Sequence, residues 1–271
     1  MTIDRTIDER QVRSAWRGVA IPSEHGGWGL TAEPVLLGLL VAFSWSGVAI
    51  GVVALLGFLL RTPVKLLAVD HRRGRHLERD RRARRVALVE TVLLAVFVTA
   101  ASAGAGWTWL VPVAIALPLV AVEFWYDVRS RSRRLVPELC GAVGISSTAA
   151  AIIVAGDGSA RLAAAAWLIL AGRGVTSIPF VRTQIQRLRH GDASLRVADA
   201  LQVLGVAVAL VGVIVDVAVV VGAGSVAVLA IAQAMWMRRS PVPPAVQIGV
   251  RQMLLGLAVV LATTAGVLTL A

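Results

Sequence analysis

The chain has 271 residues, of which 57% are hydrophobic, and its mean hydropathy is +0.78. This composition excludes an ordinary soluble domain of this size and predicts an all-α protein that crosses a membrane several times. The formal net charge of +11 would favour a nucleic-acid partner in a soluble protein, but here the cations lie between apolar runs. We therefore expect membrane lipids as partners and no nucleic acid.

Nine apolar segments follow one another, and each is about as long as a membrane helix. They cover residues 28–44, 47–66, 86–104, 108–126, 136–155, 161–181, 197–214, 218–237 and 248–270. Asp216 lies between the seventh and eighth segments, which favours a helical hairpin over one very long helix. We expect residues 1–21 to form a cytoplasmic tail and residues 22–271 to form a single nine-helix transmembrane domain.

The basic residues are distributed unevenly between the two predicted membrane faces. The N-terminal tail and every second connection contain 25 of the 27 Lys and Arg residues, while Arg161 lies in an outer connection and Arg173 lies inside a segment. Basic loops stay in the cytoplasm, so this pattern predicts an inside N terminus and an outside C terminus.

The most hydrophilic stretch runs from Arg61 to Arg85 and contains ten cations. Such a stretch cannot lie in hydrocarbon, so we expect a loop at the cytoplasmic face. Three acids and two histidines stand among these cations, so the loop could hold a metal ion or an anion: Asp70, Glu78, Asp80, His71 and His76. The alternative is a topology signal whose acids only pair with arginine.

Polar residues also enter the first apolar segment, in the run PSEHGGWGLTAEP. His25 and Glu33 are eight residues apart and so lie close to one helical face, and Pro34 is expected to break or kink the helix directly after Glu33. A carboxyl group in apolar surroundings is a candidate substrate or proton group. The alternative is a cap at the interface, bonded to a neighbouring helix.

The fourth segment ends with Glu123 and Asp127 four residues apart, on one face and just before a basic turn. We expect Asp127 and the arginines after it to line the mouth of a polar cavity. Glu138 follows in the first turn of the next segment, where a helix-capping role is the leading interpretation.

Arg173 stands between two glycines in the middle of the sixth segment. A charge at this depth is costly and usually faces a partner or water, so we expect it to pair with Glu33, Glu123 or Asp127. The alternative is a shorter helix from which Arg173 snorkels to the interface. Residues 182–199 form a second polar cluster on the same side as the Asp70 stretch.

The runs SEHGGWG, VDHRRGR, WYDVRSRSRR and IPFVR together resemble the YwiC-like family of bacterial membrane proteins, over nearly the whole chain from Pro22. That family in turn resembles the UbiA superfamily of intramembrane prenyltransferases. The resemblance implies a UbiA-like bundle of nine helices with an inside N terminus, in the bacterial plasma membrane. It also implies two Asp-rich cytoplasmic motifs that hold magnesium and a prenyl diphosphate, although this chain lacks the Asn-Asp-x-x-Asp-x-x-x-Asp pattern of the first motif.

The resemblance implies a function and a set of site residues. The protein would bind an isoprenoid diphosphate or a similar amphipathic anion in a polar chamber open to the cytoplasm, and would transfer the prenyl group to an acceptor. Asp70, Asp127 and Glu33 are the catalytic candidates. The expected magnesium ligands are Asp70, Glu78 and Asp192. The expected substrate-binding residues are His25, Arg72, Arg129, Arg173 and Arg182.

Two functions without catalysis remain open from the sequence. In a carrier or permease, Arg173 and a membrane carboxylate would neutralise an anion near the midplane. In an accessory protein for assembly of a membrane redox complex, the basic stretch would dock a partner protein. The sequence contains no CxxCH, Walker or HExxH motif, so it does not predict the chemistries that those motifs support.

Overall fold

The computed structural model describes residues 18–20, 25–75, 77–131 and 133–270, with the side chains of 25 and 26 excepted. Within these ranges the chain is helical and contains no strand, which confirms the predicted all-α class. Apart from 18–20, the predicted tail of residues 1–21 lies outside the described residues.

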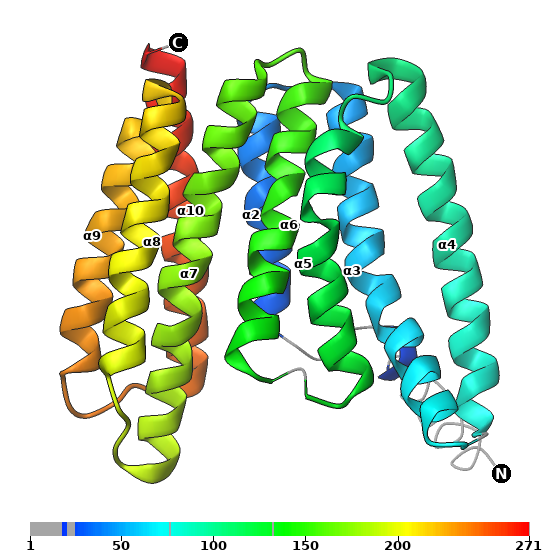
Figure 1. Cartoon of the computed structure of the whole chain (residues 1–271), viewed down its shortest axis with the longest axis horizontal. Coiled ribbons are helices and arrows are strands. Elements are labelled where there is room, and N and C mark those ends of the chain that lie inside the picture. The colour runs from blue at the N-terminus through cyan, green and yellow to red at the C-terminus, as the bar shows by residue number, and fades with distance from the viewer. Residues whose placement is uncertain (1–17, 21–24, 76, 132, 271) are drawn as a thin grey trace, which may run out of the picture.

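In the described part of the chain, nine helices of 17 residues or more cross the molecule in alternating directions (Figure 1). They are α2 (His25–Val41), α3 (Trp45–Arg72), α4 (Glu78–Ala105), α5 (Leu110–Val128), α6 (Leu135–Ala155), α7 (Ala160–His190), α8 (Arg196–Val215), α9 (Val220–Met237) and α10 (Ala245–Leu270). Eight are long and apolar enough to span a membrane, and the apolar part of α2 is shorter, at Gly27–Val41. The chain is therefore an integral, multi-pass membrane protein.

The structure corrects the expected loop between Arg61 and Arg85. Most of that stretch is helical, because α3 continues to Arg72 and α4 begins at Glu78, so only residues 73–77 connect them. In the same way α7 continues past its predicted end to His190. Arginine is a good helix former, so these helices extend beyond their apolar spans without interruption.

Two predictions about single turns have opposite outcomes. The predicted hairpin near Asp216 is present: α8 ends at Val215, and the Asp216 carboxylate accepts a hydrogen bond from the amide of Ala218. Pro34 does not break its helix, because α2 continues through it to Val41. A proline removes only one backbone donor, and the packing of α2 against α6 and α10 keeps the helix whole.

The helices differ in how much of their surface is covered by protein. Helices α6 and α7 lie at the centre, and 61% and 72% of their apolar spans are buried. Small residues allow this close packing: the backbones of Gly172 in α7 and Gly205 in α8 approach so closely that a β-carbon on either would collide with the other helix. By contrast α4 packs against α3 alone to any substantial extent among the described residues, and only 11% of its span is buried.

Candidate functional site

A cluster of four charged side chains, Arg61, Lys65, Glu123 and Asp127, joins α3 to α5 near their arginine-rich ends. Asp127 is fully buried, with Arg61 Nε 2.7 Å from its Oδ2 and Lys65 Nζ 3.3 Å from its Oδ1. A second nitrogen of Arg61, Nη1, lies 2.8 Å from Glu123 Oε1. The cluster contains two acids and two bases, so its formal charges cancel. The predicted shared face of Glu123 and Asp127 is confirmed, and their cations come from α3.

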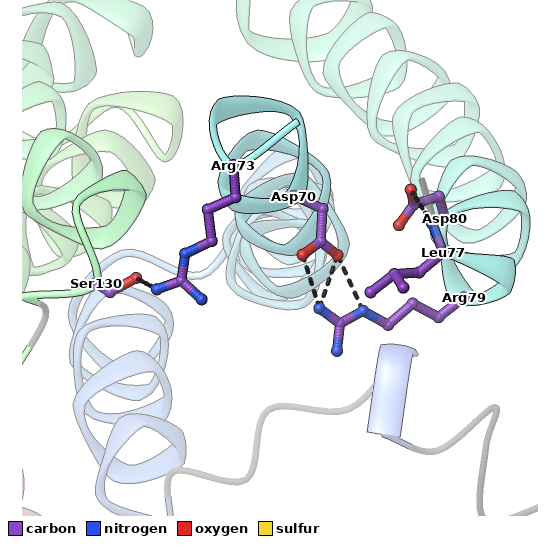
Figure 2. Close-up of polar contacts among 6 residues, drawn as sticks. All are labelled: Asp70, Arg73, Leu77, Arg79, Asp80 and Ser130. Carbon is purple, nitrogen blue, oxygen red and sulfur yellow. Dashed lines mark hydrogen bonds and ion pairs between the residues drawn. The ribbon is translucent and has the colours of Figure 1, made fainter. Parts of the chain in front are cut away.

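The turn between α3 and α4 is held by a second ion pair (Figure 2). Arg79, in the first turn of α4, reaches back to Asp70 near the end of α3 and donates from Nε at 2.9 Å and from Nη2 at 2.7 Å. Asp80 accepts a hydrogen bond from the amide of Leu77 and so satisfies a donor at the start of α4. Arg73 points the other way and donates to the hydroxyl of Ser130, beyond the end of α5.

We expect Asp70→Ala to lower the free energy of unfolding by about 1–2 kcal/mol, because Arg79 would lose a buried, doubly bonded partner. Glu78→Ala is the matched control, since Glu78 lies in the same turn but is exposed and has no ion pair among the described residues. Reversible unfolding in mixed micelles would measure both variants. Equal losses would show that the Asp70 ion pair adds nothing to the turn.

The residues predicted to hold magnesium are not brought together. Asp70 is occupied by Arg79, Glu78 is exposed on α4, and Asp192 is exposed in the connection from α7 to α8, where it bonds to the amide of Ala193. No group of three acidic, histidine or cysteine side chains in the described part of the chain is placed to bind a metal ion. The residues present therefore do not fit the magnesium site that the UbiA resemblance implies, since magnesium requires several converging oxygen ligands.

Six exposed arginines lie at the end of α3 and in the turn from α5 to α6, and none is paired with a carboxylate among the described residues. We call them the basic rim: Arg72, Arg73, Arg75, Arg131, Arg133 and Arg134. Arg72 donates to the carbonyl of Val128 at 3.1 Å and Arg73 donates to Ser130 at 3.0 Å, so the two parts of the rim are tied together. Nearby, the guanidinium of Arg129 lies 3.3 Å from the centre of the Trp125 ring.

A buried ion pair connects α2, α7 and α10 inside the bundle. Arg173 Nη2 lies 2.8 Å from Glu33 Oε1 and also donates to the main-chain carbonyl of Gln252 at 2.8 Å. The side chains are 5% and 8% exposed. The predicted pairing of Arg173 is confirmed, with Glu33 as its partner, and the alternative in which Arg173 snorkels to the surface is wrong.

Comparison with known proteins finds one family-level similarity. The family model described as YwiC-like protein matches residues 21–153, just under half of the chain. Over this region the chain is similar to the YwiC-like family. No curated protein matches the chain, and no solved structure does.

The YwiC-like region runs from α2 to near the end of α6. It contains the charged cluster, the basic rim and Glu33. Arg173 and Gln252 lie beyond it, so the buried ion pair joins the YwiC-like region to the rest of the chain.

Sequence reasoning missed three buried glutamines beside this ion pair. Gln202 in α8 donates to Oε1 of Gln233 in α9 at 3.1 Å, and Gln233 Nε2 lies 3.4 Å from Gln252 Oε1 in α10. Gln202 also donates to the carbonyl of Thr176 in α7 at 2.9 Å. Each glutamine is a lone amide in an apolar segment, which is the signal that could have revealed this polar layer.

Arg182 and His25 are the two other residues that were predicted to bind substrate. Arg182 pairs with Glu138 at 2.8 Å and donates to the carbonyl of Arg133, so it joins the start of α6 to the C-terminal part of α7. Glu138 has an ion-pair role there as well as its expected place in the first turn of α6. His25 begins α2, but its side chain lies outside the described residues.

We expect Gly256→Ala to destabilise the protein by about 1–3 kcal/mol, because a β-carbon at Gly256 would overlap the Glu33 carboxylate and crowd Arg173 Nη2. Gly249→Ala is the matched control on the same helix, since a β-carbon there would meet nothing within 4 Å. Alanine favours helix, so the control variant should be as stable as the parent or slightly more stable. Thermal unfolding in detergent would compare them, and equal melting temperatures would contradict the predicted collision.

Proposed function

We propose that the protein binds an amphipathic anion, of the isoprenoid diphosphate class, at the arginine-rich end of the bundle. The observation that supports this proposal is the basic rim, six exposed arginines without a carboxylate partner among the described residues. Basic loops stay in the cytoplasm, so the head group would be held at the cytoplasmic face of a bacterial plasma membrane.

The acids near the rim support an anionic ligand rather than a cationic one. Asp70, Glu123 and Asp127 each have an arginine or lysine partner, so their charge does not offset the rim. Guanidinium groups match phosphate oxygens in geometry and bind them through paired, charge-assisted hydrogen bonds. A diphosphate could therefore be held by arginines directly.

The apolar part of the ligand would lie along α4 and α5, whose lipid-facing sides begin beside the rim. Only 11% and 17% of their spans are buried, and large side chains such as Leu88, Val92 and Ile115 are more than half exposed. An isoprenoid chain is as apolar as the lipid tails that it would replace. The tail would therefore orient the ligand without strengthening its binding greatly, and the arginines would supply the selectivity.

Prenyl transfer is the step that the resemblance to the UbiA superfamily adds to this proposal. It would require magnesium on Asp70, Glu78 and Asp192, and these residues do not fit that ion. We therefore propose binding of the amphipathic anion without a transfer step.

Native mass spectrometry with farnesyl diphosphate, in the absence of magnesium, tests the proposal. The parent protein should retain one ligand, and Arg131→Gln and Arg134→Gln should each weaken retention by about tenfold, the value of one charge-assisted hydrogen bond. Arg161→Gln is the matched control, because Arg161 is an exposed arginine at the opposite end of the bundle. Retention that is equally strong in all variants, or absent from the parent, would refute the assigned site.

A further inference from the structure

The contact between Arg173 and Glu33 leaves hydrogen-bond donors unused. A single nitrogen of Arg173, Nη2, serves both Glu33 and the carbonyl of Gln252. Arg173 Nε is buried and has no partner among the described residues, and the same is true of Gln252 Nε2. Because Arg173 is already bonded to the main chain of Gln252, both unused donors belong to the contact between α7 and α10.

Buried donors in this position favour an oxygen-bearing ligand. An amide or guanidinium N–H without an acceptor is costly in an apolar interior, and inside a membrane no bulk water relieves that cost. Within the glutamine layer, Gln252 Oε1 already accepts from Gln233. The one unused amide oxygen, Gln202 Oε1, belongs to α8, at the other end of the chain of amides from Gln252. Two unused donors at one contact between helices, one of them on a cation, match the oxygens of a carboxylate or another compact oxyanion.

The charge of the site determines what must accompany such an anion. Arg173 and Glu33 neutralise each other, so a bound monovalent anion would leave a net negative charge inside the membrane unless Glu33 became protonated. Among the described residues, Arg173 is the one cation that forms an ion pair with Glu33. Other charged groups on the helices packed against α2 are engaged elsewhere, namely Arg61 and Lys65 of α3 with Asp127, Glu138 of α6 with Arg182, and Arg251 of α10 with the ring of Trp236.

We propose that Arg173 and Gln252 bind a compact monovalent oxyanion, such as a carboxylate, and that Glu33 takes up one proton from solution when the anion binds. The proton neutralises the Glu33 carboxylate, the Arg173 guanidinium exchanges Glu33 for the anion, and the site keeps its net charge of zero. Binding therefore becomes stronger as the pH falls. This site is independent of the basic rim and requires no amphipathic ligand.

Isothermal titration of the purified protein with nitrate tests the proposal. Nitrate is a planar monovalent oxyanion that does not itself titrate, so any proton taken up must come to the protein. Titrations in two buffers of different ionisation enthalpy would count those protons. We expect the parent protein to bind nitrate with uptake of up to one proton per site, and Glu33→Gln to bind nitrate without proton uptake, because glutamine mimics the protonated acid.

Arg173→Gln should weaken nitrate binding at least about tenfold. If this variant does not fold, Glu33→Gln combined with Arg173→Gln removes both charges and should show the same loss. Arg161→Gln, at an exposed position at the opposite end of the bundle from the basic rim, is the control and should leave nitrate binding unchanged, while Arg131→Gln shows whether nitrate binds at the basic rim instead. Three results would overturn the proposal: no nitrate binding by the parent protein, binding without proton uptake, or binding that depends on Arg131 and survives the loss of Arg173. None of these three results would change the outcome expected in the farnesyl diphosphate assay, which tests the basic rim.

Discussion

Replacing Arg173 with methionine should cost about 3–5 kcal/mol of the free energy of unfolding, because Glu33 would remain buried without its partner. Replacing Glu33 with leucine alone should lower the free energy of unfolding by a similar amount, because the Arg173 guanidinium would then be buried without its carboxylate partner. The double variant Glu33→Leu/Arg173→Met should recover most of the loss, because two apolar side chains need no partner. Reversible unfolding in mixed micelles would measure the three variants and give the coupling energy of the pair.

The comparison has a clear contrary outcome. If the double variant is as unstable as the sum of the single variants, the two residues act independently, and the ion pair does not stabilise the contact between α2 and α7. Gly249→Ala, at an open position on α10, controls for general sensitivity of this part of the bundle to substitution.

Replacing Asp127 with alanine should have an effect of comparable size, about 3–5 kcal/mol. Asp127 is fully buried and is the ion partner of both Arg61 and Lys65, so its loss leaves the cluster with an excess of positive charge between α3 and α5. Unfolding in mixed micelles would give the loss of stability. Asp127→Asn should be less damaging, because the amide keeps an oxygen acceptor for Arg61.

Asp199→Ala provides the matched control for Asp127. Asp199 also pairs with an arginine, Arg238 at 2.8 Å, but the two side chains are 36% and 53% exposed. Exposed ion pairs contribute at most about 1 kcal/mol, so this variant should remain close to the parent protein. If Asp127→Ala and Asp199→Ala lowered the free energy of unfolding equally, burial would not determine how much these ion pairs contribute to stability.

The sequence predicted the membrane architecture well because hydropathy and charge act over whole segments. Each of the nine expected spans corresponds to a helix, and the pairing of Arg173 followed from the cost of a charge in hydrocarbon. The choice of Glu33 over Glu123 or Asp127 was beyond the sequence, because it depends on how α2, α5 and α7 are placed in space. Glu123 and Asp127 are instead paired with Arg61 and Lys65, which both lie on α3.

Helix ends and neutral polar residues were predicted less well. The end of an apolar span does not mark the end of its helix, because arginine side chains can continue a helix into the aqueous interface, as they do in α3 and α7. The glutamines carry no charge, so the argument from the cost of a charge in hydrocarbon, which singled out Arg173, does not point to them. Their importance comes from meeting one another across α8, α9 and α10, which no single segment reveals.

The position of α4 at the edge of the bundle has a consequence for local opening. Among the described residues, its contacts pass almost entirely through α3, and the ion pair of Asp70 with Arg79 links the two helices at one end. A helix held by one neighbour can detach without disturbing the centre, so its opening requires less free energy than unfolding of the whole chain. The edge formed by α4 is therefore where exchange with surrounding lipid, or with a partner helix, would cost the protein least.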